Sequence, residues 1–65
     1  MKKSPGMRLA EAIKARGLTH EKVERALRVS RGVVSRWIHG DRRPTIENAL
    51  RLRKRFGIEV EAWAA

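Results

Sequence analysis

Turn-forming residues most constrain what this chain can fold into. Glycines 17, 40 and 57 and Pro44 break the sequence into short segments, and residues of these types favour helix ends and turns. Within the segments, apolar residues recur three and four positions apart, and no segment shows the regular alternation that a strand requires. The sequence therefore predicts an all-α domain, a compact bundle of five short helices.

Periodicity and capping residues set the expected boundaries. Residues 1–6 should form a flexible basic N-terminal arm and residues 7–65 one domain. Thr19, Ser30 and Thr45 are the expected N-caps. Helices are expected over residues 7–16, 20–27, 31–39 and 46–55, with a short turn at 58–63. The apolar stripes predict that the following residues face inward: Leu9, Ala10, Ile13, Val23, Ala26, Leu27, Val34, Trp37, Ile38, Ile46, Ala49, Leu50 and Phe56.

The charge balance points to a polyanionic partner. Sixteen Lys and Arg residues face seven Asp and Glu, which gives a formal net charge of +9 and a pI near 11.6. DNA, RNA and an anionic membrane surface all fit such an excess. The sequence has no long apolar run and no signal-peptide pattern, so we expect a cytoplasmic protein, associated with the nucleoid in a bacterial host.

Cysteine is absent, which excludes disulfides and thiolate metal sites. The two histidines, His20 and His39, are far apart in the sequence, so neither a metal nor a cofactor is expected. A chain of 65 residues buries a small core. Its stability should come from well-packed helices, to which self-association would add.

Residues 19–40 carry the pattern that bears on function. Only Leu27-Arg28-Val29 separates the second and third expected helices, and so short a link makes two helices cross steeply, as in a helix-turn-helix. Val34 and Trp37 would dock the third helix on the core. Its opposite side, which in a helix-turn-helix enters the DNA major groove, carries Arg31, Gly32, Ser35, Arg36 and His39. An ordinary amphipathic helix with a solvated face is the alternative interpretation.

The stretch from Gly17 to Ile58 resembles the phage Cro/repressor family of helix-turn-helix proteins. The residues that carry the resemblance are, in order, Gly17-Leu18-Thr19, Val29-Ser30, Val34-Ser35-Arg36-Trp37, Gly40, Arg42, Pro44-Thr45, Glu47-Asn48, Leu52 and Phe56-Gly57-Ile58. The resemblance implies a lambda repressor-like domain that binds double-stranded operator DNA and regulates transcription.

Three positions depart from the family pattern. His20 stands where a Gln usually donates to a phosphate, Glu24 where a small Ala usually lies at the helix crossing, and Arg28 where Gly is usual in the turn. Either the two helices cross at a slightly wider distance, or Glu24 points outward toward Arg28. The pattern leaves the geometry of the turn at Arg28 open.

The helix-turn-helix interpretation assigns two sets of residues. Arg31 and Arg36 are expected to donate to guanine, and Val33 to touch a thymine methyl. The full base-reading set is Arg31, Gly32, Val33, Ser35 and Arg36. Phosphates should be bound by the first backbone N–H groups of the second and third helices. The side chains expected to bind phosphate are His20, Ser30, His39, Arg42 and Arg43.

One such domain covers only a half-site, so we expect a homodimer on a palindromic or pseudo-palindromic operator, formed in solution or only on the DNA. Ile58, Val60 and Trp63 are the candidate dimer interface. The alternative is that Trp63 packs on the fourth helix of its own chain.

These features favour a phage or prophage Cro-like repressor that acts by operator occlusion, without a small-molecule effector. An antitoxin or a restriction-modification controller protein could use the same domain. A protein-interaction or RNA-binding module is disfavoured because the aromatic residues look buried. A membrane-active peptide would need an unbroken amphipathic helix. An enzyme would need a nucleophile with its base, a carboxylate pair or a phosphate loop, and the sequence shows none of these.

Overall fold

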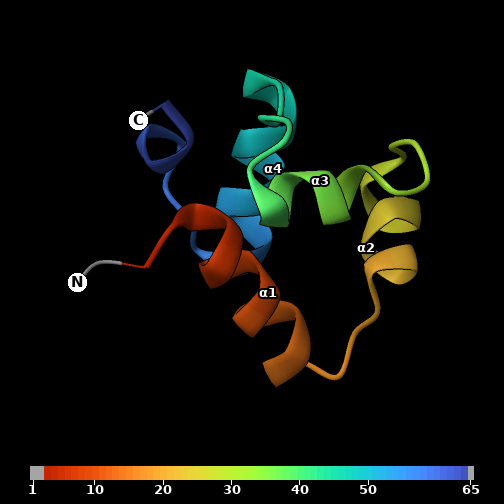
Figure 1. The fold of residues 1–65 in the computed structure, drawn as a ribbon. Coiled ribbons are helices and arrows are strands. Elements are labelled where there is room, and N and C mark those ends of the chain that lie inside the picture. Colours follow the sequence, from red (N-terminus) through yellow and green to blue (C-terminus); the bar gives the residue numbers. More distant parts are fainter. Residues whose placement is uncertain (1–2, 65) are drawn as a thin grey trace.

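Residues 3–64 fold into four α-helices and one short 3-10 helix. The computed structural model describes residues 3–64. In chain order the elements are α1 (Pro5–Ala15), α2 (His20–Leu27), α3 (Val33–His39), α4 (Ile46–Phe56) and the 3-10 helix η1 (Val60–Ala64) (Figure 1). The predicted all-α class is confirmed, with no strand in the described part of the chain. The expected fifth helix is the 3-10 segment, so the bundle has four α-helices rather than five.

Helix α1 begins earlier than the sequence suggested. Ser4 is its N-cap, and the Ser4 hydroxyl accepts the backbone N–H of Met7 at 3.2 Å. The helix therefore starts at Pro5, a favourable first position for proline. Pro5 and Gly6 thus belong to the folded domain and not to the expected arm. Residues 1 and 2 of that arm lie outside the described residues.

Helices α2 and α4 begin where their capping residues predict. The hydroxyls of Thr19 and Thr45 each accept the backbone N–H three residues further along, at 3.1 and 3.2 Å. Gly57 ends α4 in the left-handed conformation (φ 73°), which a glycine adopts without steric cost. Local capping chemistry therefore accounts for the ends of these helices.

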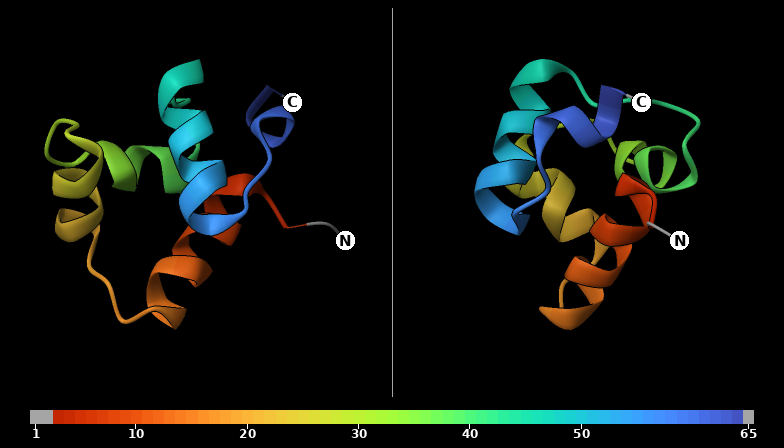
Figure 2. Two further views of the ribbon diagram at one scale, coloured as in Figure 1. Left: turned by 180° about the vertical axis from the view of Figure 1, so that it is seen from behind. Right: turned by 90° about the vertical axis from the view of Figure 1, so that its left-hand side faces the viewer.

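A single core holds the elements together, and α3 lies in the middle of the bundle. Figure 2 shows α2 at one side of the molecule and η1 at the other. None of the helices in residues 3–64 combines the length and the apolar character needed to cross a membrane. The buried apolar side chains come from all five elements and the segments between them: Leu9, Ile13, Val23, Leu27, Val33, Val34, Trp37, Ala49, Leu52, Ile58 and Trp63.

Three residues that the apolar stripes placed in the core are exposed instead. Ile46 is 75 % exposed and Leu50 49 %, because the inward side of α4 is formed by Ala49 and Leu52, and Ile46 and Leu50 lie on the neighbouring side. Ala26 is also exposed. The buried side of the short helix α2 carries Val23 and Leu27, and Ala26 lies outside that side.

Gly6 lets α1 approach the end of α3 closely. A Cβ atom on Gly6 would meet the carbonyl oxygen of Ile38 and lie 2.8 Å from that of Trp37. Real Cβ contacts are not this short, so no larger residue fits here without moving the helices apart. The absence of a side chain at Gly6 therefore sets the distance between α1 and the C-terminal end of α3.

An ion pair joins α1 to the segment before η1. Two guanidinium N–H groups of Arg8 donate to the two carboxylate oxygens of Glu59, each at 2.9 Å. Hydrogen bonding to Glu59 raises the pKa of Arg8 above its already high ordinary value. Arg8 is therefore a permanent cation that fastens the C-terminal segment to the bundle.

Candidate nucleic-acid interface

Helix α3 begins two residues later than predicted. Gly32 is its N-cap with a left-handed backbone (φ 86°), and the first helical residue is Val33. Ser30 contributes its backbone carbonyl, which accepts the N–H of Val33 at 3.3 Å, and Arg31 lies with Gly32 in the turn before the helix. Val33 is only 8 % exposed and packs in the core, which leaves little of its side chain for a thymine methyl.

The chain leaves α2 at Arg28, which has a left-handed backbone (φ 56°). The N–H of Arg28 donates to the carbonyl of Arg25 at 3.2 Å, and that of Val29 to the carbonyl of Glu24 at 3.0 Å. These bonds close α2 in the way that a glycine at this position usually allows. A residue with a Cβ adopts the conformation at a cost of about 1–2 kcal/mol. The turn thus keeps the glycine-type geometry, and Arg28 carries the strain.

Glu24 does not point outward toward Arg28. It is 5 % exposed, and its Oε2 accepts the backbone N–H of Gly32 at 2.9 Å and that of Val34 at 3.1 Å. The carboxylate therefore caps α3 from the preceding helix. These two N–H groups are not available to a phosphate, so the backbone contact expected at the start of the third helix is not supported.

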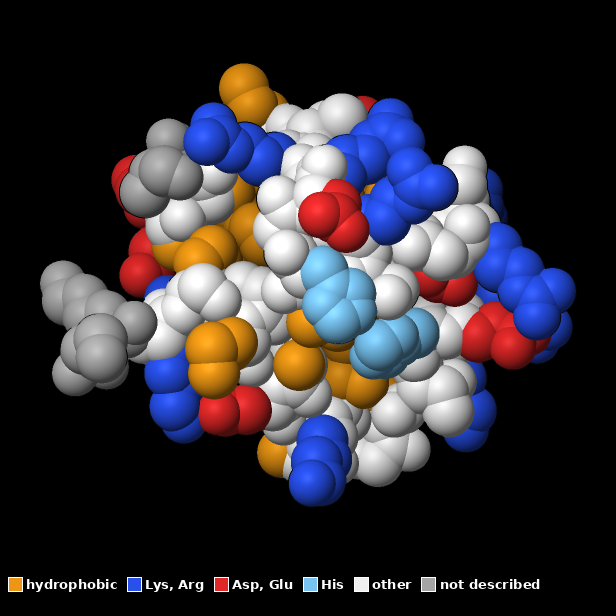
Figure 3. Space-filling model, viewed as in Figure 1, with side chains coloured by type: hydrophobic (Ala, Val, Ile, Leu, Met, Phe, Trp, Pro, Cys, Tyr) orange, Lys and Arg blue, Asp and Glu red, His pale blue; other side chains and the backbone are white. Residues whose placement is uncertain are grey.

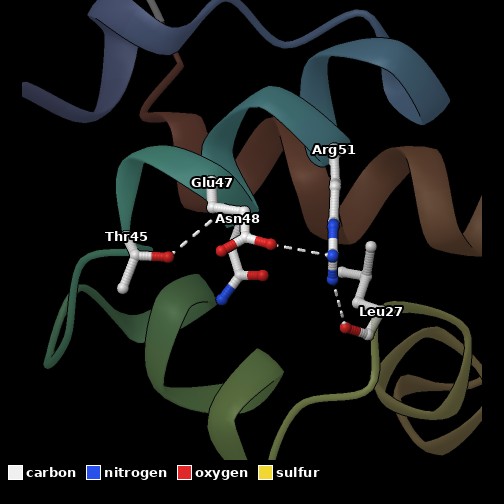
Figure 4. Close-up of polar contacts among 5 residues, drawn as sticks. All are labelled: Leu27, Thr45, Glu47, Asn48 and Arg51. Atoms are coloured by element: carbon white, nitrogen blue, oxygen red, sulfur yellow. Dashed lines mark hydrogen bonds and ion pairs between the residues drawn. The ribbon is translucent and has the colours of Figure 1, made fainter.

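Arg51 braces the other side of the turn. Its Nη1 donates to the carbonyl oxygen of Leu27 and its Nη2 to Oε1 of Glu47, both at 2.9 Å (Figure 4). The carbonyl belongs to the last residue of α2, where a helix leaves acceptors without partners. Figure 4 also shows Thr45 and Asn48 at the start of α4, where the Thr45 hydroxyl accepts the backbone N–H of Asn48. Helix α4 is thereby tied to the end of α2.

The two sides of α3 differ as the sequence predicts. Trp37 is 2 % exposed and fixes the inner side in the core. On the outer side, Arg36 and His39 are exposed and Ser35 is half-buried, and Arg31 is exposed in the turn before the helix. Burial of the tryptophan thus leaves Arg36 and His39 on the solvent side of α3.

The other residues expected to bind phosphate lie on neighbouring segments. His20 is the first residue of α2, and Arg42 and Arg43 lie in the loop between α3 and α4; all three are exposed. Arg28 and Ser30 line, with this loop, a shallow hollow of about 200 Å³ between the turn and the start of α4. Figure 3 shows both histidines on one face of the molecule, with Arg or Lys side chains along its edges.

Ion pairs occupy some of the basic side chains and leave others without an acidic partner. The pairs join Lys3 to Glu11, Arg8 to Glu59, Arg25 to Glu21 and Arg51 to Glu47. Among residues 3–64, no ion pair or side-chain hydrogen bond involves Arg31, Arg36 or Arg42. Three of the expected DNA-binding arginines are therefore available to an outside anion.

The candidate dimer interface is largely buried within the chain itself. Trp63 is 7 % exposed and Ile58 is fully packed, whereas Val60 is half-buried. The intramolecular packing of Trp63 is therefore the alternative that the structure supports. An apolar surface does remain nearby, where Pro44, Ile46 and Val60 border a hollow of about 180 Å³ with Trp63 beneath it.

The family of the chain follows from a comparison with known proteins. A family model described as helix-turn-helix matches residues 9–63, which include the turn, both crossing helices and the core described above. The chain belongs to this helix-turn-helix family of DNA-binding transcription regulators. Searches of curated proteins and of solved structures found no significant match. Residues 3–64 contain no group of three or more acidic, His or Cys side chains that could hold a metal ion.

Proposed function

We propose that this protein is a sequence-specific regulator that inserts α3 into the major groove of double-stranded DNA, and that it is a Cro-like repressor of phage or prophage origin. The observation that carries the proposal is the environment of Arg31 and Arg36. Arg31 is exposed in the turn before α3, and Arg36 is exposed on α3, whose inner side is fixed by Trp37. Neither arginine has an ion-pair partner among residues 3–64. Repression follows from occupying an operator that RNA polymerase must also reach.

Base reading is assigned to Arg31 and Arg36, each of which can donate two hydrogen bonds to guanine and discriminate against other bases by about 1–3 kcal/mol. Ser35 lies between them and is half-buried, so it reaches only a closely approaching base or phosphate. Gly32 has no side chain to hold the turn away from the duplex. Val33 is assigned no contact with a base because its side chain is buried.

Phosphate binding is assigned to the residues that flank α3 on both sides. The side chains are those of His20, Ser30, His39, Arg42 and Arg43. With about four to six phosphates neutralised per copy, log affinity should fall against log salt with a slope of about −4 to −5. This sequence-independent contribution would let the protein associate with any duplex before it finds its operator.

Two copies are proposed to bind a palindromic operator, with recognition helices about 34 Å apart. Pro44, Ile46 and Val60 offer apolar surface for a contact between the copies, with Trp63 beneath it, whereas Ile58 is buried in the core. We propose that the protein acts without a small-molecule effector. Antitoxins and restriction-modification controllers would bind DNA in the same way, and the genes next to the operator distinguish them from a repressor.

RNA binding is less well supported. Single-stranded RNA is usually read by aromatic side chains that stack on bases, and the chain has two Trp and one Phe. Trp37 and Trp63 are buried, and Phe56 is half-buried beneath the guanidinium of Arg16, 5.0 Å from the ring centre. No aromatic ring in residues 3–64 is therefore presented for stacking.

Selection of binding sites from random duplexes tests the proposal. We expect the wild type to enrich one palindromic or pseudo-palindromic sequence. Arg36→Ala should relax the preference at one base position in each half-site, whereas Arg42→Ala should weaken binding to all sequences similarly and reduce the salt slope by about 1. Arg53→Ala, which removes an exposed arginine from α4, is the matched control. Reversed profiles for Arg36 and Arg42 would overturn the assigned roles, and no enriched sequence would overturn the function.

A further inference from the structure

Glu24 is a buried acid at the centre of the helix-turn-helix, and the DNA-binding roles above leave it unassigned. Its side chain comes from the middle of α2 and is 5 % exposed. A carboxylate in such a place is stable only when donors surround it. Oε2 receives the N–H groups of Gly32 and Val34 at 2.9 and 3.1 Å, and Arg25 and Arg31 line the hollow beside it.

Helix α3 has no cap of its own. Gly32 occupies the N-cap position and makes no side-chain cap bond, so without Glu24 the N–H groups of Gly32 and Val34 would lose their acceptor at the start of α3. A negative charge at this end also interacts favourably with the helix dipole. Both bonds converge on one oxygen, which fixes the start of α3 in distance and in direction relative to α2.

We propose that Glu24 is the positioning residue for DNA reading: it holds the start of α3 against α2 so that Arg31 and Arg36 meet base edges while His20 meets the DNA backbone. The inference rests on the proposed DNA-reading function of α3. Arg31 immediately precedes Gly32, whose N–H the carboxylate accepts, so any shift of that bond moves Arg31 directly. The same carboxylate occupies the helix end that a phosphate could otherwise use, which makes α3 depend on its side chains for binding.

The effect of Glu24 is therefore on selectivity, and it appears as a ratio of two affinities. Glu24→Gln keeps the length of the side chain but replaces the charged acceptor by a weaker neutral one. We expect the ratio of affinity for the selected operator to affinity for an unrelated duplex to fall about tenfold, comparable to one mismatched base pair. Affinity for the unrelated duplex should stay the same or rise, because a negative charge is lost beside the DNA.

Glu21→Gln is the matched control. It removes one negative charge from the same helix, but Glu21 is exposed and bonds only to Arg25 among residues 3–64. Its effect should be similar on both duplexes, so the affinity ratio should stay within about twofold of the wild type. A second variant, Glu24→Asp, keeps the charge and shortens the reach, and we expect it to lower the ratio as well.

Amide hydrogen exchange supplies a readout that does not depend on DNA. The N–H groups of Gly32 and Val34 should exchange faster in Glu24→Gln than in the wild type, at a temperature where urea titration shows both proteins to be folded. An unchanged ratio in both folded Glu24 variants, or an equal loss in Glu21→Gln, overturns the inference. A wild type that prefers no sequence at all overturns the proposed function instead.

Discussion

Two sets of arginines on the surface of the domain differ in whether they form an ion pair with a glutamate. The open set consists of those expected DNA-binding arginines that have no ion-pair partner among residues 3–64, namely Arg31, Arg36 and Arg42. The paired set contacts glutamates and consists of Arg8, Arg25 and Arg51. Net charge alone indicates a polyanionic partner. The positions of the glutamates show which cations hold the fold and which remain available to that partner.

Removing Arg51 should show the largest effect of the paired set. Arg51→Ala deletes the bond to the Leu27 carbonyl together with the largely exposed Glu47 ion pair. We expect the free energy of unfolding to fall by about 1.5–2 kcal/mol, most of it from the charged hydrogen bond to the backbone. Urea titration measures the change. Operator affinity well below the melting temperature should stay the same; weakened binding at normal stability would move Arg51 into the open set.

Exchanging Arg for Lys should separate base reading from phosphate binding within the open set. Arg36→Lys keeps the charge but loses the planar fork that pairs with guanine, so affinity for the selected operator should drop about tenfold, or about 1.4 kcal/mol. Arg42→Lys should change affinity by less than about twofold, because a phosphate accepts either cation. Titration of labelled operator DNA compares the two. Equal losses would mean that both residues meet the same kind of group.

Arg28 has no ion-pair partner among residues 3–64 but is not one of the expected DNA-binding arginines, and its left-handed backbone makes a separate prediction. Arg28→Gly should raise the free energy of unfolding by about 1 kcal/mol, because glycine adopts the left-handed conformation without strain. For a domain of this size, the melting temperature should rise by about 4–8 °C. Arg28→Ala loses the same charge but keeps a Cβ, so its stability should stay close to that of the wild type. A gain in both variants would assign the effect to charge.

Arg25 should show the smallest effect. Its ion pair with Glu21 lies on the surface, one helical turn apart, at 3.0 Å, and such pairs contribute about 0.3–0.5 kcal/mol. Arg25→Ala should therefore lower the free energy of unfolding by less than about 0.5 kcal/mol. Raising the salt concentration should reduce the difference further. A loss comparable to that of Arg51→Ala would mean that the hollow shared with Glu24 matters more than the surface pair.

The sequence predicted those parts of the site that depend on local patterns. The spacing of Val34 and Trp37 indicated which side of α3 is buried, and hence that Arg36 points outward. The predicted start of α3 was wrong, because Ser30 has the chemistry of an N-cap but the N-cap position is occupied by Gly32. The group that caps α3 is a carboxylate oxygen of Glu24, eight residues before Gly32, and no local capping rule links these two positions. The unusual acid at the helix crossing was the available signal.

The errors in the core have a similar origin. Ile46 and Leu50 are apolar and helically spaced, but the period alone does not say which of two adjacent sides of α4 meets the bundle. Burial of Ala49 and Leu52 settles this through contacts with distant segments. In the same way, the pattern leaves both an interface and an intramolecular position open for Trp63, and only the fold shows that its own chain covers it.

The contact at Gly6 has a consequence for how α3 responds to its surroundings. Two backbones meet there with no side chain between them, so there are no rotamers to adjust and no charges to screen. Short-range repulsion of this kind hardly changes with ionic strength or temperature. The C-terminal end of α3 is therefore fixed by the backbone contact with α1, whereas its N-terminal end is held by electrostatic attraction to the carboxylate of Glu24. Heating or added salt should loosen the helix from the Arg31 end first.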